Sequence, residues 1–394
     1  IKSWQNAGRL PLFITATCEF SRFDDAAFND LTGTYDQKTS AGELALLGNK
    51  SGAIALMSTT RVVYSAPNAF LNSNIFKTAF SPDSSGKSLT LGDIIRIAKN
   101  NSGSGTNKRN FTLLGDPALR LAYPWHGRIL TDSVNNLTEG KITDTLKALS
   151  VITVHGHIED SKGQISDKFN GIVSPVVFDK LSSVRTLAND GGSSVDFMIR
   201  NNILFSGKTR AVNGKFSFSF IVPRDIDYTP GKGKISYYAS DTEADMQGYT
   251  NNIVVGGFAS NTMNDTRGPS IELYMNDTLF RDGGITSTNP KLMAVIEDQG
   301  GINTTGAGIG HDITAVLDNN PKNTVILNEY FENDFDNYSR GKLFYNLTSV
   351  PEGRHSLTLK AWDNFNNSSV RSLNFIVGND GSFIIDNLIN YPNP

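Results

Sequence analysis

The hydrophobic pattern of the sequence changes near residue 130, and this change limits the possible folds more than any other feature. Before it, residues 10–17 (LPLFITAT) and 52–60 (GAIALMSTT) are continuous apolar runs, as in strands buried on both faces. Three segments have helical periodicity, and the first opens on a capping box of Ser40 and Glu43: residues 40–47, 66–80 and 89–100. Residues 111–121 read as two short strands around a Gly-Asp-Pro turn. Strands that alternate with helices predict an α/β layer with a mainly parallel sheet.

After about residue 145 the apolar residues alternate with a period of two. Residues 151–158 (VITVHGHI), 215–222 (KFSFSFIV) and 234–239 (KISYYA) have this pattern, which is typical of strands with one buried face. The polar residues 260–268 form a predicted linker to a second set of short strands. We therefore predict a multidomain fold, α/β followed by all-β, with two immunoglobulin-like sandwiches at residues 131–262 and 263–380.

Composition and charge exclude several classes of function. No apolar run approaches the roughly 18 residues that a membrane-spanning helix requires. The formal net charge is −3 and the basic residues are scattered, which argues against nucleic acid as a partner. The one cysteine, Cys18, leaves no internal disulfide and no cysteine-rich metal site. We predict no metal and no cofactor.

Cys18 follows directly on the apolar run of residues 10–17 and precedes a polar loop. The carboxyl ends of strands in α/β sheets carry ligand-binding and catalytic groups, because loops there are exposed but firmly supported. A thiol at this place can act as a nucleophile if an imidazole takes its proton. The alternative is a buried cysteine that only fills space.

The histidines offer no partner for this thiol in the α/β layer: His126, His155, His157, His311 and His355. His155 and His157 share one face of a predicted strand, and a surface pair is the better interpretation than a metal site. His311 reads as a turn residue. Acidic loops at residues 24–25, 318–320 and 329–336 lack the spacing of a calcium-binding EF-hand, so we interpret them as solvated charge.

Five segments, in order, resemble the gingipain-type cysteine peptidases: residues 15–25 (TATCEFSRFDD), 40–47 (SAGELALL), 52–68 (GAIALMSTTRVVYSAPN), 91–100 (LGDIIRIAKN) and 110–124 (NFTLLGDPALRLAYP). Within that family they are most similar to the sortase-like signal peptidases of the type IX secretion system of Bacteroidetes. Residues 388–394 (LINYPNP) resemble the start of the C-terminal domain of type IX-associated proteins, which we place at residues 381–394.

The resemblance implies that residues 1–130 are the C-terminal part of a caspase-like peptidase domain with a Cys–His dyad. Cys18 matches the position of the family's nucleophile. The dyad histidine of the family precedes the cysteine by about thirty residues in a His-Gly context, and this sequence has only seventeen residues before Cys18. We expect the chain to be a piece of a longer protein and to be inactive alone. Glu19 and Arg61 are weaker candidates for the substrate pocket.

For the function, the resemblance implies an exported peptidase and transpeptidase at the cell surface or outer membrane. Its partners would be the C-terminal signal domains of secreted proteins, an outer-membrane barrel protein and anionic lipopolysaccharide. Two alternatives stay open at this point. One is a general gingipain-like endopeptidase, and the other is an adhesion or docking module without catalysis.

Overall fold

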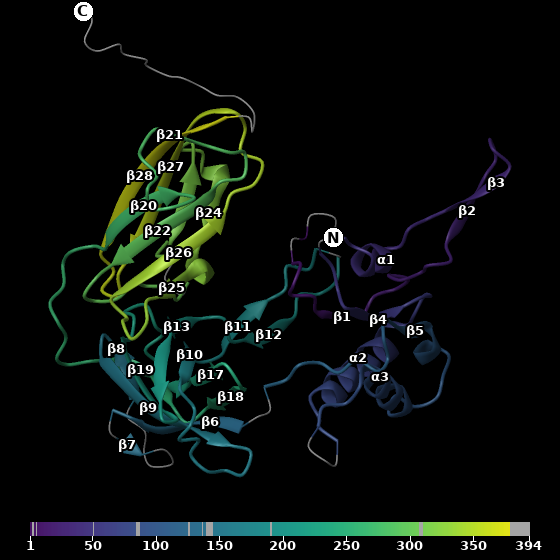
Figure 1. The fold of residues 1–394 in the computed structure, drawn as a ribbon, viewed down its shortest axis with the longest axis horizontal. Coiled ribbons are helices and arrows are strands. Elements are labelled where there is room, and N and C mark those ends of the chain that lie inside the picture. Colours follow the sequence, from purple (N-terminus) through teal and green to yellow (C-terminus); the bar gives the residue numbers. More distant parts are fainter. Residues whose placement is uncertain are drawn as a thin grey trace, which may run out of the picture. The chain divides into compact units, whose positions relative to one another are not determined.

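The computed structural model describes residues 1, 4, 6–49, 51–83, 87–124, 127–135, 145–189, 191–306 and 310–378, and the backbone of 137–138. The chain divides into two compact units, Ile1–Tyr123 and Pro124–Pro394 (Figure 1). The prediction of a β-rich, multidomain chain is confirmed. His126 and the predicted C-terminal segment at residues 381–394 lie outside the described residues. Within the described residues, no helix has both the length and the apolar character that crossing a bilayer requires.

A three-stranded sheet forms the centre of the N-terminal unit, in the order β1 (Leu12–Ile14), β4 (Ala55–Thr59), β5 (Phe111–Leu114). β1 runs parallel to β4, whereas β5 is antiparallel to it. Every residue of β4 is buried, as its continuous apolar sequence predicts. The described sheet therefore has one parallel and one antiparallel pairing, rather than being mainly parallel.

Helices cover both faces of this sheet: α1 (Ala41–Leu46), α2 (Ser65–Ala79) and α3 (Leu91–Asn100). Met57 packs with residues of α2 and α3, such as Ile75 and Ile94. Leu56, which points to the opposite face, packs with Ala45 of α1. Two apolar layers result, so the strand between them has no exposed side.

The predicted capping box at the start of α1 is confirmed. The Ser40 hydroxyl accepts the Glu43 N–H at 3.2 Å, and the Glu43 carboxylate accepts the Ser40 N–H at 2.8 Å. These two bonds satisfy amide donors that a six-residue helix cannot satisfy internally.

Two parts of the N-terminal unit differ from the sequence analysis. Residues 26–37, to which no structure was assigned, form the hairpin of β2 (Ala26–Asn29) and β3 (Thr34–Gln37), which projects from the unit in Figure 1. The second strand predicted within residues 111–121 is reduced to one bridge, between Thr90 and Arg120. Its backbone carbonyls are used elsewhere, because Pro117 O and Leu119 O accept N–H groups at the start of α3.

Among the described residues, the first β set has fourteen strands: β6 (Gly127–Val134), β7 (Leu137–Thr138), β8 (Thr145–Ala148), β9 (Val151–Asp160), β10 (Gly171–Phe178), β11 (Ser182–Arg185), β12 (Asp196–Ile199), β13 (Ile203–Ser206), β14 (Thr209–Val212), β15 (Lys215–Ile221), β16 (Gly231–Lys232), β17 (Lys234–Ser240), β18 (Asp245–Thr250) and β19 (Val254–Phe258). Its main sheet closes on itself, since β10 pairs both with β14 and with β17 at the other end of the path. This closure differs from the two separate sheets that a simple sandwich predicts. Stacked rings of Phe205, Phe218 and Phe220 lie in its core.

The second β set comprises nine strands: β20 (Ser270–Met275), β21 (Gly284–Thr286), β22 (Lys291–Glu297), β23 (Thr314–Leu317), β24 (Thr324–Ile326), β25 (Phe331–Asn333), β26 (Arg340–Asn346), β27 (Gly353–Trp362) and β28 (Ser368–Val377). They form two sheets, β20-β22-β26-β25 and β21-β28-β27-β23-β24 (Figure 1). Alternate residues of β22 and β27, including Ala294, Ile296, Leu357 and Leu359, share one core. Buried residues alternate with more exposed ones over residues 357–362 of β27, as in a strand with one buried face.

Candidate functional site

The segment after β1 crosses the carboxyl end of β4. The Thr15 N–H donates to Met57 O at 3.1 Å, and the Ser21 N–H donates to Thr59 O at 2.9 Å. Between these contacts, the Thr59 hydroxyl donates to Thr17 O at 2.6 Å. These bonds hold residues 15–21 against the edge where two parallel strands end, which is the place the sequence predicts for Cys18.

Cys18 is exposed, so the alternative of a buried thiol is wrong. Its thiol donates a hydrogen bond to Val63 O at 3.4 Å. Val63 belongs to the loop that follows β4, and its own side chain is buried. The sulfur is therefore accessible but has a defined orientation, as a nucleophile requires.

Glu19, the residue after Cys18, has a φ of +53°. A left-handed backbone at a residue other than glycine costs on the order of 1–2 kcal/mol. Its carboxylate accepts a hydrogen bond from Arg22 Nη1 at 2.9 Å, and the Nε of Arg22 lies 3.7 Å from Asp25 Oδ1. The left-handed turn at Glu19 lies between Cys18 and the charged residues Arg22 and Asp25. The Glu19 carboxylate is already paired with Arg22.

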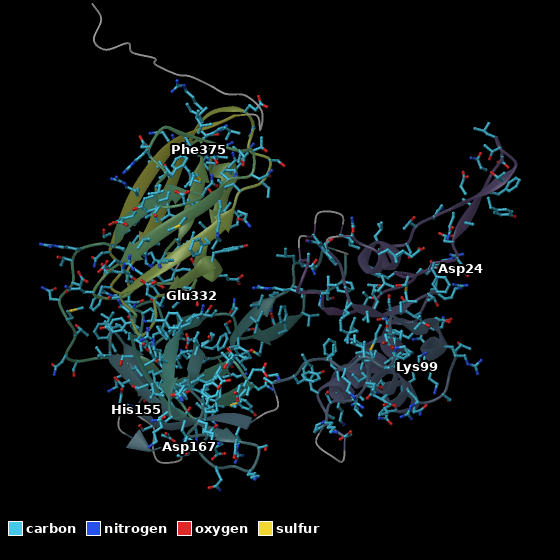
Figure 2. The ribbon with its side chains drawn as sticks, viewed as in Figure 1. Asp24, Lys99, His155, Asp167, Glu332 and Phe375 are labelled. Atoms are coloured by element: carbon cyan, nitrogen blue, oxygen red, sulfur yellow. The ribbon has the colours of Figure 1, made fainter. Side chains whose placement is uncertain are left out.

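Arg61 lies two residues after β4, at the same edge of the sheet. Its guanidinium donates to both oxygens of Asp24, at 3.0 and 2.6 Å, and also to Thr60 O at 2.7 Å. The hydrogen bonds from Arg61 hold the pKa of Asp24 below its usual value. Figure 2 shows Asp24 near the base of the β2–β3 hairpin. The structure thus brings Arg61 to the edge that carries Cys18, but with its bidentate site occupied by a residue of the same chain.

Sequence reasoning missed two asparagines that fix the loop of Arg61 and Val63. The Tyr64 N–H donates to Asn107 Oδ1 at 2.6 Å, and Asn110 Nδ2 donates to Val62 O at 2.9 Å. Both residues come from the short 3₁₀ turn Asn107–Asn110, more than forty residues further along the chain. Asparagine favours such side-chain-to-backbone bonds, but nothing in the local sequence indicates which loop it will bind.

The sequence has no histidine among residues 1–124, so the N-terminal unit supplies no imidazole for Cys18. His155 and His157 lie on the same half-buried face of β9, as predicted, and Figure 2 labels the first of them. The Nδ1 of His157 lies 2.6 Å from Asp132, and its Nε2 lies 3.5 Å from Glu159.

The other two described histidines also have partners within the C-terminal unit. His311 Nδ1 lies 2.6 Å from Asp225 Oδ2, and the ring packs against Trp362. His355 contacts Asp318 Oδ2 and Pro351 O, each at 2.8 Å. His311 therefore has a buried ionic partner, which is more than the turn position that the sequence suggested.

The acidic loops that were interpreted as solvated charge have partners among neighbouring residues. Arg61 pairs with Asp24, and Arg340 with Asp334. The Ser356 N–H donates to Asp318 at 3.0 Å. A different carboxylate cluster, formed by Asp265, Asp298 and Asp363, was not identified from the sequence.

Comparisons with known proteins relate the chain to a family of peptidases. Residues 1–122 match the model of peptidase family C25. No curated protein sequence matches the chain. Among solved structures, dimeric latent PorU from Porphyromonas gingivalis is 30% identical, with a TM-score of 0.41 over 88% of this chain and 33% of that chain. The Arg-specific cysteine proteinase gingipain R is 13% identical, with a TM-score of 0.27 over 63% of this chain and 47% of that chain.

The chain thus spans a third of the length of the PorU chain and about half of the gingipain R chain. The family match ends within the N-terminal unit, one residue before Tyr123. It contains Cys18 and the loop that accepts its hydrogen bond. The resemblance to the gingipain-type enzymes is therefore confirmed, and residues 1–122 of the chain match peptidase family C25, a family of cysteine peptidases.

Proposed function

We propose that the whole protein is a cysteine peptidase and transpeptidase of the type IX secretion system, with Cys18 as its nucleophile. It would remove the C-terminal signal domain from secreted cargo and help to attach the cargo to the cell surface. The observation that carries this proposal is the exposed thiol of Cys18, held at the carboxyl edge of β1 and β4 inside the segment that matches family C25.

The proposed chemistry is acyl transfer through a thioester. A histidine outside this sequence takes the thiol proton, and the thiolate attacks the carbonyl between the cargo and its signal domain. The Cys18 N–H helps to hold the resulting oxyanion, and the protonated histidine then gives its proton to the leaving amine. Water or an amine of anionic lipopolysaccharide attacks the thioester and releases the cargo. Residues 1–394 alone would be inactive, because the dyad histidine of this proposal lies outside this sequence.

Two surface charges complete the proposed pocket. Glu19 follows the nucleophile, and Arg61 shares its sheet edge. Because each is paired with a neighbour, Arg22 or Asp24, a charged substrate must displace that neighbour to bind. We therefore assign them to substrate selection and not to the chemical step.

The fold assignments belong to the same proposal. Residues 1–130 would be the C-terminal part of a caspase-like domain, and residues 131–262 and 263–380 two immunoglobulin-like sandwiches. The two-sheet core of the second β set supports the assignment of residues 263–380, whereas the closed main sheet of the first β set departs from a simple sandwich. These modules would present the peptidase at the outer membrane beside a barrel partner, with the cell surface as the place of action.

Replacing the nucleophile in the full-length protein, expressed in its own host, tests this function. With Cys18→Ala, we expect secreted cargo to keep its C-terminal domain and to lack the mass added by the glycolipid. Ser73→Ala, an exposed hydroxyl on α2, is the matched control and should leave cargo processing unchanged. If Cys18→Ala and Ser73→Ala reach the cell surface in equal amounts, the loss of cargo processing is an effect on the chemical step.

The alternatives give different results in the same experiment. Normal cargo processing with a loss of digestion of external protein would identify a general endopeptidase. If neither activity changed, Cys18 would be a structural thiol and the docking-module interpretation would replace the enzyme.

A further inference from the structure

Three carboxylates meet where the chain enters the second β set. Asp265 belongs to the linker between β19 and β20, Asp298 follows the last residue of β22, and Asp363 follows the last residue of β27. One oxygen of each lies within 4.8 Å of an oxygen of the other two. The cluster thus joins the linker to one strand end from each of the two sheets.

Two of these carboxylates are removed from water. Asp298 is 9% exposed and Asp363 is completely buried. In the part of the chain that the structure describes, no lysine, arginine or histidine forms an ion pair with any of the three. Burying an ionised carboxylate without a counter-charge costs several kcal/mol, so a site with two of them requires a cation or bound protons.

Neutral amide donors hold the carboxylates in place but bring no positive charge to them. Asp363 Oδ1 accepts the N–H groups of Phe365 and Asn367, at 2.9 and 2.7 Å. Asp298 Oδ1 accepts the Gly300 N–H at 2.7 Å. Asp363 Oδ2 accepts a hydrogen bond from Asn367 Nδ2 at 2.8 Å, and Asp265 Oδ1 accepts the Arg267 N–H at 3.0 Å. Each of these donors is a neutral amide, so none of them offsets the charge of an ionised carboxylate.

A neutral oxygen beside the cluster independently lacks a donor. Asn364 directly follows Asp363 and is 4% exposed. Its amide nitrogen donates to Gly300 O at 2.8 Å, in the turn after Asp298, while its Oδ1 is buried without a partner among the described residues. The cluster therefore combines buried oxygen acceptors with neutral amide donors and has no described cationic side chain, an environment that favours a bound cation.

We infer that Asp265, Asp298 and Asp363 bind one calcium ion. Calcium takes six to eight oxygen ligands in flexible geometry, whereas zinc prefers nitrogen and sulfur, and magnesium requires a near-ideal octahedron of oxygens. The candidate ligand atoms of these three residues are all oxygens, and they come from three separate chain segments. Carboxylates and backbone carbonyls with a few waters would complete the shell.

The three carboxylates also repel one another when they are ionised. The pKa of Asp298 is raised to about 7, mainly by burial and in part by the nearby Asp363 and Asp265 carboxylates. Burial likewise raises the pKa of Asp363. A bound calcium ion would offset the repulsion among the three carboxylates. It would also hold Asp265 in place and so attach the linker to the second β set.

The test uses the whole 394-residue chain, first freed of metal with a chelator. Isothermal titration with calcium chloride is expected to show one site, and thermal unfolding is expected to shift upward with calcium but much less with magnesium. Asp265→Asn, at the least buried member, should weaken calcium binding at least tenfold while the chain stays folded. Asp334→Asn, an ion-paired carboxylate of the same β set, is the matched control and should bind calcium normally.

Asp298→Asn separates loss of the ion from loss of the fold. It should abolish the shift with calcium, yet in chelator it should unfold at or above the temperature of the unsubstituted chain, because it removes a repulsive buried charge. The inference is overturned if the unsubstituted chain binds no calcium at 10 mM, if magnesium binds equally well, or if Asp334→Asn weakens binding as much as Asp265→Asn. Since these readouts do not involve peptidase activity, they are independent of the proposed function.

Discussion

Arg61 and Asp24, thirty-seven residues apart in the sequence, face each other through two hydrogen bonds of 3.0 and 2.6 Å. The pair joins the loop after β4 to the segment that leads into the β2–β3 hairpin. Both side chains are 47% exposed, so the pair is a surface contact beside Cys18 and contributes little to global stability. Its significance is local, since it determines whether the guanidinium is available to a substrate.

Arg61→Gln should move the pKa of Asp24 upward, towards its ordinary value of 3.8, because the hydrogen bonds from Arg61 are the main cause of its depression. A depressed carboxyl pKa adds stability above the unfolded-state pKa and loses it as the pH falls through the folded-state value. Carbon-13 shifts of the Asp24 carboxyl group, followed from pH 2 to 6, measure this. Arg96→Gln, which breaks a similar pair with Asp93 on α3, should leave Asp24 unchanged.

The exposed thiol predicts that the native chain takes up one equivalent of iodoacetamide, at Cys18. The hydrogen bond to Val63 O orients the sulfur without covering it, so the rate should lie within about tenfold of that of the unfolded chain. Intact mass measured over time gives both rates, and Cys18→Ser should remain unlabelled. Labelling that occurs only after unfolding would contradict the position of Cys18 described above.

Ser40→Ala should destabilise α1 locally. It removes the acceptor of the Glu43 N–H and half of the capping box, at a cost of about 1 kcal/mol. Amide exchange at residues 43–46 should therefore accelerate about fivefold, while exchange in α3 stays the same. Ser40→Asp, which keeps an acceptor at this position, should exchange at nearly the original rate.

Asp225 should be one of the most sensitive polar positions of the C-terminal unit. Its carboxylate lies within 2.9 Å of donors on Asn303, His311 and Asn366, and its side chain is only 9% exposed. Asp225→Ala takes the acceptor from the buried Asn303 and from the half-buried His311 and Asn366. We expect a loss of about 3 kcal/mol, seen as a lower temperature of thermal unfolding.

Asp227→Ala is the control for Asp225, two residues away on the surface, where its carboxylate accepts only the Thr229 N–H among the described hydrogen bonds. It should change the unfolding temperature little. Equal effects of the two substitutions would mean that the contacts of Asp225 add no stability.

Elements that depend on neighbouring residues could be predicted from the sequence. The continuous apolar run of β4, the capping box of α1 and the alternating strands β9, β15 and β17 all follow from the side-chain pattern over a few residues. The position of Cys18 after a strand was also predicted, but β1 covers only Leu12–Ile14 and is half-buried, whereas the apolar run of residues 10–17 predicted a strand buried on both faces. The hairpin at residues 26–37 was missed because its exposed residues carry no such pattern.

Only the tertiary structure decided the contacts between distant segments. The closure of the first β set through β10, the binding of the 60–64 loop by Asn107 and Asn110, and the meeting of Asp265, Asp298 and Asp363 all join residues far apart in the chain. Local periodicity records which face of a segment is buried, but not which segment lies against it. The sequence by itself therefore determined the types of element and the candidate nucleophile, while packing decided the partners of its charges, because those depend on where separate strands end in space.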